Sequence, residues 1–151
     1  MNFTDAIKTC LKEKYANFSG RASRSEFWFF HLFNLICYAI FLFLAFSVTF
    51  QFFWVLGIFV IAVILPSLAV LVRRLHDVNK SGWNFLLPLP FNFVARLFTL
   101  SNSEGFLVGS LIFQIIGLGI SIYLLVLYCT HGDKKNNRFG KNIYKKKKKR
   151  R

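Results

Sequence analysis

The sequence predicts an all-α, multi-pass membrane protein with four transmembrane helices in a small bundle. Hydrophobic residues make up 55% of the 151 residues and 20 residues are Phe, which is more apolar surface than a core of this size can bury. Several apolar stretches are long enough to cross a bilayer. Almost all of the 20 Lys and Arg residues lie outside these stretches, as is typical of membrane spans with charged flanks.

Three of the four predicted spans carry no charged residue. They cover about residues 27–46, 52–72 and 105–129. A helix of about 20 residues, rising about 1.5 Å per residue, matches the roughly 30 Å hydrocarbon core of a bilayer. Only a short polar link that ends at Gln51 separates the first two spans, so we expect them to form a tight helical hairpin.

The remaining predicted span, about residues 83–100, contains Pro88, Pro90, Asn92 and Arg96. A proline inside a helix removes an amide donor and pushes away the carbonyl four residues earlier. We therefore expect this span to be kinked by its prolines, with a re-entrant or interfacial segment as the alternative. Arg96 lies near the distal end, where its long side chain can reach the headgroups.

The Lys and Arg residues predict the orientation and divide the chain into three parts. Residues 1–26 form an amphipathic N-terminal segment, residues 27–129 the membrane domain, and residues 130–151 a loop and a basic tail. Positive residues gather in the two terminal parts and in the loop between the second and third spans, whereas the other two links have none. By the positive-inside rule, both termini and this middle loop are predicted to be cytoplasmic.

The middle loop, residues 73–83, is the only internal stretch that combines both charge signs, a histidine and a turn signal. Arg73 and Asp77 are four residues apart, so we expect them to pair on one helical face. The segment that ends at Gly82 predicts a turn. A structural role, a headgroup or partner site and a catalytic site all stay open here. The sequence shows no nucleophile elbow, paired carboxylates, metal-ligand spacing or phosphate loop.

The segment before the first span predicts a capped helix start. Ser23 and Glu26 are three residues apart, which is the spacing of a capping box. Arg21 and Arg24 are then expected at headgroup level, where lipid phosphates can satisfy their charges. A specific acidic ligand for the two arginines is the alternative.

Two stripes of mild polar and small residues run along the first and fourth spans. One comprises His31, Asn34 and Tyr38; the other comprises Gly105, Gly109, Ser110, Gln114, Gly117 and Ser121. Such stripes usually mark helix packing, because small residues allow close approach and polar residues bond across the contact. The three cysteines are widely spaced, and we expect them to be reduced, small apolar residues.

The chain ends in seven consecutive cations at positions 145–151. These residues repel one another and have no apolar face to bury. We expect them to act as a salt-sensitive anchor on an anionic membrane surface. Nucleic acid is not expected as a partner, because the chain shows no structured recognition residues.

Three ordered blocks, residues 18–28, 73–83 and 132–140, carry a family resemblance. They are similar to the YhaH-like family of small bacterial inner-membrane proteins of unknown function (domain of unknown function family 805). The resemblance implies several helices in the bacterial cytoplasmic membrane, and it supplies no activity, cofactor or catalytic residue. Two departures stand in the last block: Lys134 and Lys135 lengthen it, and Asn142 and Ile143 stand where relatives tend toward proline.

All three blocks fall at the cytoplasmic ends of the predicted spans. We therefore expect a polar cap that binds anionic lipid headgroups or a membrane partner, and the chain itself is one candidate partner. The expected members are Arg21, Arg24, Glu26, Arg73, Arg74, His76, Asp77, Ser81, Trp83 and Arg138. A small transporter or holin-like pore, or a lipid-modifying enzyme that uses the same cap, is the alternative. No cofactor, metal ligand or catalytic residue is predicted.

Overall fold

The computed structural model describes residues 1–100 and 104–144. Its elements are α1 (Phe3–Lys8), η1 (Thr9–Glu13), α2 (Arg24–Ser47), α3 (Phe52–Asp77), η2 (Gly82–Leu86), α4 (Pro88–Leu100) and α5 (Glu104–Cys129). All of these elements are helical, which confirms the predicted fold class for the described part of the chain. The basic run 145–151, predicted to be a membrane anchor, lies outside the described residues.

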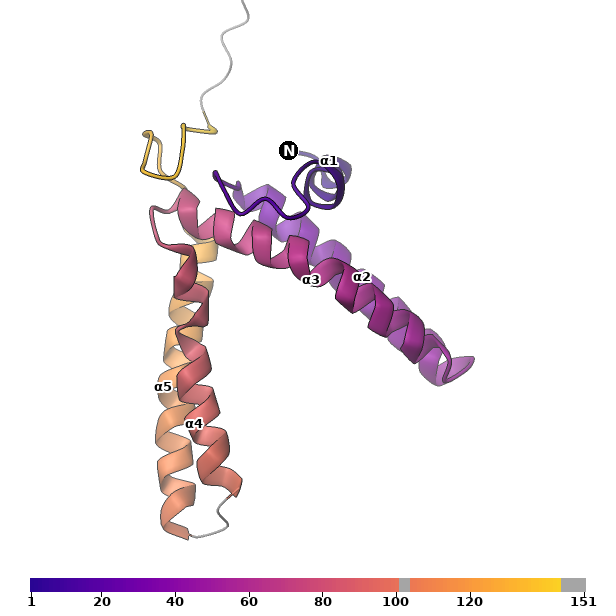
Figure 1. Ribbon diagram of the computed structural model, residues 1–151, viewed down its shortest axis with the longest axis vertical. Helices are drawn as coiled ribbons and strands as arrows, with labels where there is room; N and C mark the ends of the chain where they lie inside the picture. Colours follow the sequence, from indigo (N-terminus) through magenta and orange to yellow (C-terminus); the bar gives the residue numbers. More distant parts are fainter. Residues whose placement is uncertain (101–103, 145–151) are drawn as a thin grey trace, which may run out of the picture.

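The long helices form two hairpins that meet at one end and diverge toward the other (Figure 1). Helix α2 lies along α3, and α4 lies along α5. The N-terminus, the 78–81 loop and the segment after α5 all lie at the end where the hairpins meet. The sequence predicts a small bundle, and in the structure the helices form two diverging pairs that are joined at one end.

Three helices, α2, α3 and α5, are long and apolar enough to cross a membrane by length and composition. Their outward side chains are apolar as well: Phe43 is 68% exposed, Ile61 is 74% exposed and Ile115 is 67% exposed. Contiguous apolar surface of this extent is rare on proteins that face water. The exposed faces of these helices are therefore suited to contact with lipid.

The prolines of the third predicted span start a helix and do not kink one. Helix α4 has 13 residues, and Pro88 and Pro90 are its first and third residues. The first turn of a helix has no intrahelical acceptors for its N–H groups, so proline is tolerated there. The expected kink inside a single span is not confirmed: the chain changes conformation at Leu87, from the 3₁₀ helix η2 to α4, before the prolines are reached.

Small residues of α5 let α4 pack closely against it, as the stripe on the fourth span predicts. A Cβ added to Gly117 would lie 2.6 Å from Oδ1 of Asn92 in α4. The rings of Phe98 and Phe113 stack across the same contact, with their centroids 5.6 Å apart. Gln114, in contrast, is exposed beside this contact and takes no part in it.

The first hairpin contains a proline in the interior of one of its helices. Pro66 lies inside α3, and without an N–H it cannot pair with the carbonyl of Ala62 four residues earlier. The hydroxyl of Tyr15 donates to that carbonyl at 2.5 Å. Nearby, the amide of Asn34 donates to Ser67 Oγ at 3.1 Å, as its place in the polar stripe predicts. Tyr15 thus ties the N-terminal segment to α3.

The N-terminal segment also contributes to the main apolar core. Cys10, in η1, is buried with Phe27, Phe30 and Val70 of the first hairpin. Burial, with a smaller contribution from the charge of Glu26, raises the pKa of the Cys10 thiol to about 11. The thiol is therefore neutral near pH 7 and behaves as a small apolar residue, in line with the expectation for the cysteines.

Replacing Tyr15 with Phe should lower the unfolding free energy by about 1 kcal/mol, because the Ala62 carbonyl loses its donor. The same substitution in a Pro66→Ala chain should cost much less, since the N–H of Ala at position 66 then supplies that donor. Equilibrium unfolding of the four proteins in detergent micelles measures both values. An equal cost in the two backgrounds would show that Tyr15 does not act through this carbonyl.

Candidate functional site

Five charged side chains are buried where the two hairpins meet. This buried ionic cluster consists of Arg21, Glu26, Arg73, Arg74 and Asp77, none of which is more than 5% exposed. The first comes from the loop before α2, the second from the first turn of α2, and the other three from the end of α3. Burying a charge is costly unless it is paired and hydrogen-bonded, so each member needs partners within the protein.

Asp77 binds three of its neighbours. Its Oδ1 accepts from Arg21 Nε at 2.8 Å, and its Oδ2 accepts from Arg74 Nη1 at 2.6 Å. The hydroxyl of Tyr144 also donates to Oδ2, at 2.5 Å. Burial, the hydrogen bond to Asp77 and the charge of that carboxylate raise the pKa of Tyr144 to about 12. Tyr144 therefore remains a protonated donor near pH 7.

The expected ion pair between Arg73 and Asp77 is wrong. Arg73 pairs with Glu26 of α2, at 2.5 Å between Nη1 and Oε1, and Arg74 pairs with Asp77. Adjacent residues of a helix point about 100° apart, so the two arginines reach different neighbours. Sequence spacing shows which side chains share a helical face, but it does not show which other segment lies against that face.

The predicted capping box is confirmed in its first half. The Ser23 hydroxyl caps α2 by accepting from the backbone N–H of Glu26 at 3.2 Å. The Glu26 carboxylate pairs with Arg73, and no described hydrogen bond returns it to the cap residue. The ion pair between the two helices therefore takes the place of the second half of the box.

Arg74 joins the first hairpin to the end of the second. Its Nε donates to the carbonyl of Tyr128 at 3.1 Å, and its Nη2 lies 3.4 Å from the carbonyl of Leu127 and also donates to that of Thr130. These carbonyls belong to the last turn of α5 and the residue after it, where the helix leaves acceptors unpaired and its dipole is negative. Arg74 thus caps α5 with a positive charge supplied by α3.

Arg21 holds the segment that follows α5. Its guanidinium donates to the carbonyl of Lys135 at 2.9 Å and to the carbonyl of Asp133. The backbone N–H of Asp133 in turn donates to the carbonyl of Asp77 at 2.9 Å. A Cβ at Gly132 would collide with the Asp77 carboxylate, so glycine is required where this segment crosses the end of α3. The last family block therefore completes the buried ionic cluster.

These contacts account for three of the arginines expected to bind headgroups. Arg21, Arg73 and Arg74 are buried. The guanidinium N–H groups that form hydrogen bonds donate to carboxylates and backbone carbonyls of the protein. Two other members of the predicted cap, Arg24 and Arg138, are exposed. The residues of the predicted cap thus separate into two groups. One group forms the buried ionic cluster between the hairpins, and the other, smaller group is accessible from outside.

Four members of the predicted cap, His76, Ser81, Trp83 and Arg138, border a hollow of about 750 Å³ beside the buried ionic cluster, and Arg24 does not line it. Ser81 and Gly82 line it, and a Cβ at Gly82 would lie 2.7 Å from a methyl carbon of Val72, so the loop passes close to α3 there. Its other walls include Phe18, His76, Trp83, Phe85, Arg138 and Phe139. Residues from all three family blocks therefore meet around one cavity.

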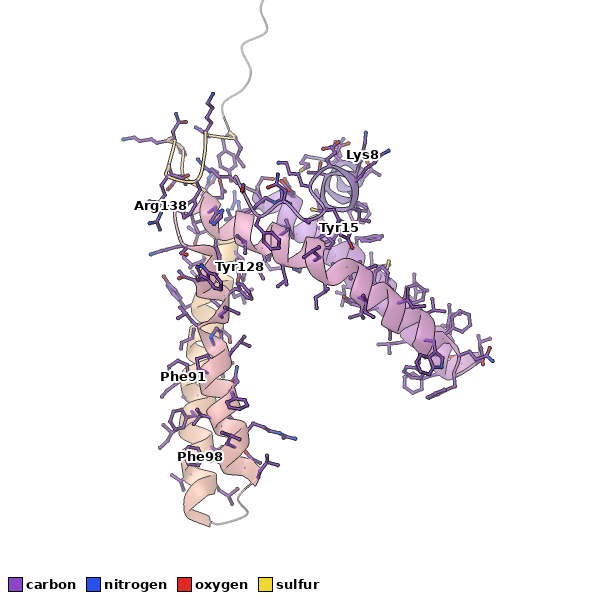
Figure 2. The ribbon with its side chains drawn as sticks, viewed as in Figure 1. Lys8, Tyr15, Phe91, Phe98, Tyr128 and Arg138 are labelled. Carbon is purple, nitrogen blue, oxygen red and sulfur yellow. The ribbon has the colours of Figure 1, made fainter. Side chains whose placement is uncertain are left out.

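Aromatic contacts position the polar groups of the hollow. The His76 ring stacks on Phe139, with centroids 3.9 Å apart and planes at 5°. His76 Nδ1 donates to the Gly20 carbonyl at 3.2 Å, which orients the ring. The Arg138 guanidinium lies 4.7 Å above the Phe139 ring, a cation–π geometry, and remains exposed on the C-terminal segment (Figure 2).

The hollow is chemically suited to an amphipathic anion. Five of its eleven lining residues have aromatic rings, Arg138 is its cation, and no carboxylate is among its lining residues. Aromatic walls with a few placed polar groups are typical of small-molecule sites. Among the described residues, no group of three or more His, Cys, Asp and Glu side chains is placed to hold a metal ion.

Several residues of the site were missed from the sequence. Phe18 and Phe139 lie within the family blocks, yet apolar residues beside a membrane span carry no sign of a binding role. Tyr144 stands next to the basic run, and nothing in its surroundings indicates a partner 67 residues away. Only the fold brings these residues to the end of α3.

A double-mutant cycle between Arg74 and Asp77 should show strong coupling of their unfolding free energies. Each single substitution to Ala should cost about 3–5 kcal/mol, because it leaves the other charge buried and unpaired. The double substitution should cost much less than the sum of the two. Equilibrium unfolding in detergent measures the cycle, and a cycle between Arg73 and Asp77 is the control. Stronger coupling in the control cycle would contradict the observed pairing.

Comparison with known proteins identifies relatives of the whole membrane domain. The family DUF805, described as a protein of unknown function, matches residues 15–141. The inner membrane protein YhaI of Escherichia coli K12 is 33% identical over 129 residues, which are 85% of this chain and 86% of that protein. The inner membrane protein YhaH of the same strain is 39% identical over 88 residues, 52% of this chain and 69% of that protein. No solved structure matches the chain.

The matched region contains the five members of the buried ionic cluster and all the residues that line the hollow, whereas Tyr144 lies just beyond it. It begins at Tyr15, which binds the Ala62 carbonyl, and it ends at residue 141, after Arg138 and Phe139. The names of both relatives place them in a membrane, in keeping with the three long apolar helices found here. The chain is therefore a multi-pass membrane protein.

Proposed function

Since the chain belongs to the DUF805 family, whose description names no activity, we propose its function from geometry: it binds an anionic lipid. The proposed site is the hollow beside the buried ionic cluster. Its aromatic walls accept the upper part of an acyl chain, and the Arg138 guanidinium pairs with the headgroup phosphate. The observation that carries the proposal is the meeting of all three family blocks around this one hollow.

The position of the hollow favours a lipid over a water-soluble anion. Val72 and His76 line the hollow from the end of α3, which is apolar enough to cross a membrane. Trp83 is 76% exposed at its edge, and tryptophan is enriched at the level of lipid headgroups. A lipid can therefore place its headgroup in the hollow while its chains stay in the bilayer.

The buried ionic cluster supports this site in two ways. It contains three arginines and two carboxylates, so it carries one excess positive charge close to the hollow. It also fixes the end of α3 and the segment after α5, from which His76 and Arg138 reach the hollow. A binding site works best when such supporting contacts hold its residues in place.

We further propose four crossings of the inner membrane, with both termini and the hollow on the cytoplasmic side. Five residues of η2 and 13 of α4 span roughly 30 Å when they are added end to end, which is enough for a fourth crossing. Both described ends of the chain lie at the same end of the molecule, as an even number of crossings requires (Figure 1). The excess of Lys and Arg at that end favours the cytoplasm.

Reporter fusions test this topology. A reporter placed after Gln51 or Ser103 should be active in the periplasm, and one placed after Lys80 should be active in the cytoplasm. A periplasmic result at Lys80 would contradict the orientation. A cytoplasmic result at Ser103 alone would show that the segment with α4 does not cross.

Arg138→Gln should weaken the retention of phosphatidylglycerol by roughly tenfold, because one charge-assisted hydrogen bond is lost. Native mass spectrometry of the purified protein, titrated with this lipid in detergent, measures the bound fraction. Lys141→Gln is the matched control, since it removes the same charge from an exposed residue that does not line the hollow. It should retain lipid as the unaltered protein does.

Two results would contradict the proposed lipid site. If both substitutions lower retention equally, net charge alone attracts the lipid and the hollow has no special role. If phosphatidylcholine with the same acyl chains is retained equally well, the protein does not select an anionic headgroup. A second variant, Trp83→Ala, tests the aromatic wall and should weaken retention without changing net charge.

A further inference from the structure

Two side-chain amides face outward midway along the second hairpin. Asn92 of α4 and Gln114 of α5 are both exposed, and neither has a hydrogen-bond partner among the described residues. Gln114 lies ten residues after the first residue of α5 and 15 before the last, so it is close to the middle of a helix suited to cross a membrane. The two amides are therefore expected at the depth of the hydrocarbon core.

The two amides border a second hollow, of about 410 Å³. Its remaining walls are Leu111, Ile115, Leu118 and Ser121, all on α5. The Ser121 hydroxyl donates to the carbonyl of Gly117 in its own helix, so it does not satisfy either amide. The hollow is thus apolar, with two unpaired amides at its edge.

Within residues 1–100 and 104–144, no hydrogen-bond partner meets either amide. Asn92 lies over Gly117 of the adjacent helix, which fixes its position on the hairpin. The first hairpin diverges from the second along the membrane-spanning length (Figure 1). Lipid chains have no hydrogen-bonding groups, so an amide left facing them is unfavourable. A partner that supplies both a donor and an acceptor is required.

We propose that this face binds a second copy of the chain. Each amide has an oxygen that accepts and an NH₂ group that donates, so Asn and Gln are complementary to each other. A two-fold axis through the hollow would set Asn92 of each copy against Gln114 of the other. The exposed side chains of Ile115 and Leu118 would fill the hollow of the facing copy.

The chemistry of the face favours a second copy over other occupants. Its lining residues carry no charge, so they give a charged partner segment nothing to pair with. A lipid can fill the apolar hollow but leaves the amides without partners. An uncharged surface with amides at matching positions satisfies them, and the chain itself presents that surface.

Disulfide crosslinking tests the geometry in liposomes. The background protein carries Cys37→Ala and Cys129→Ser and keeps the buried Cys10. Leu118→Cys should form a crosslinked dimer on oxidation, since residue 118 lies close to the two-fold axis. Ile116→Cys is the matched control, because an exposed residue two positions away points about 200° around the helix. Equal crosslinking at both positions would overturn the proposed face.

Single-molecule counting of labelled protein in liposomes tests the role of the amides. The unaltered protein should be a dimer at low protein density, and Asn92→Leu or Gln114→Leu should each weaken association by roughly 3- to 20-fold. Asn92→Gln keeps an amide and should restore most of the association. A monomeric unaltered protein would overturn the proposal, as would dimers that persist unchanged in the Asn92→Leu, Gln114→Leu double variant.

Discussion

The arrangement of the two hairpins depends on one buried carboxylate, that of Asp77. It accepts from Arg21, Arg74 and Tyr144, which come from the loop before α2, from α3 and from the segment after α5. The two arginines use their remaining donors on backbone carbonyls at the end of α5 and just beyond it. The buried, charged carboxylate is stabilised only when all three segments are in place. Asp77 therefore couples the folding of the two hairpins.

This joint leaves the rest of the molecule open. The hairpins diverge from the buried ionic cluster, and the helices expose apolar faces along their length (Figure 1). Because the polar contacts gather at one end, that end is rigid enough to hold a shaped hollow lined by His76 and Arg138. The opposite ends of the hairpins have no comparable contact with each other among the described residues. The proposed lipid site and the proposed contact between copies thus use different parts of one framework.

The sequence predicts the long helices well because the apolar stretches and their charged flanks reflect a direct physical requirement, the thickness of the bilayer. The sequence also identifies charged residues that form the buried ionic cluster, since Arg21, Arg74 and Asp77 all lie in the family blocks. The sequence does not correctly predict which residues these charged side chains pair with. Spacing alone predicts that Arg73 pairs with Asp77, whereas the packing of α2 against α3 places Arg73 against Glu26. Contacts such as that of Tyr144 cross 67 residues and leave no local pattern to detect.

The distance between the far ends of the two hairpins tests most directly whether the buried ionic cluster fixes their arrangement. Spin labels at Phe50 and Leu100, both exposed at those ends, report it by double electron–electron resonance in liposomes. The otherwise unaltered protein, with Cys37→Ala and Cys129→Ser, should give one narrow distribution. Asp77→Asn, which keeps the side-chain size and leaves Arg21 and Arg74 without a counter-charge, should give a broad one. An unchanged narrow distribution in an Asp77→Asn protein of equal helix content would contradict the account.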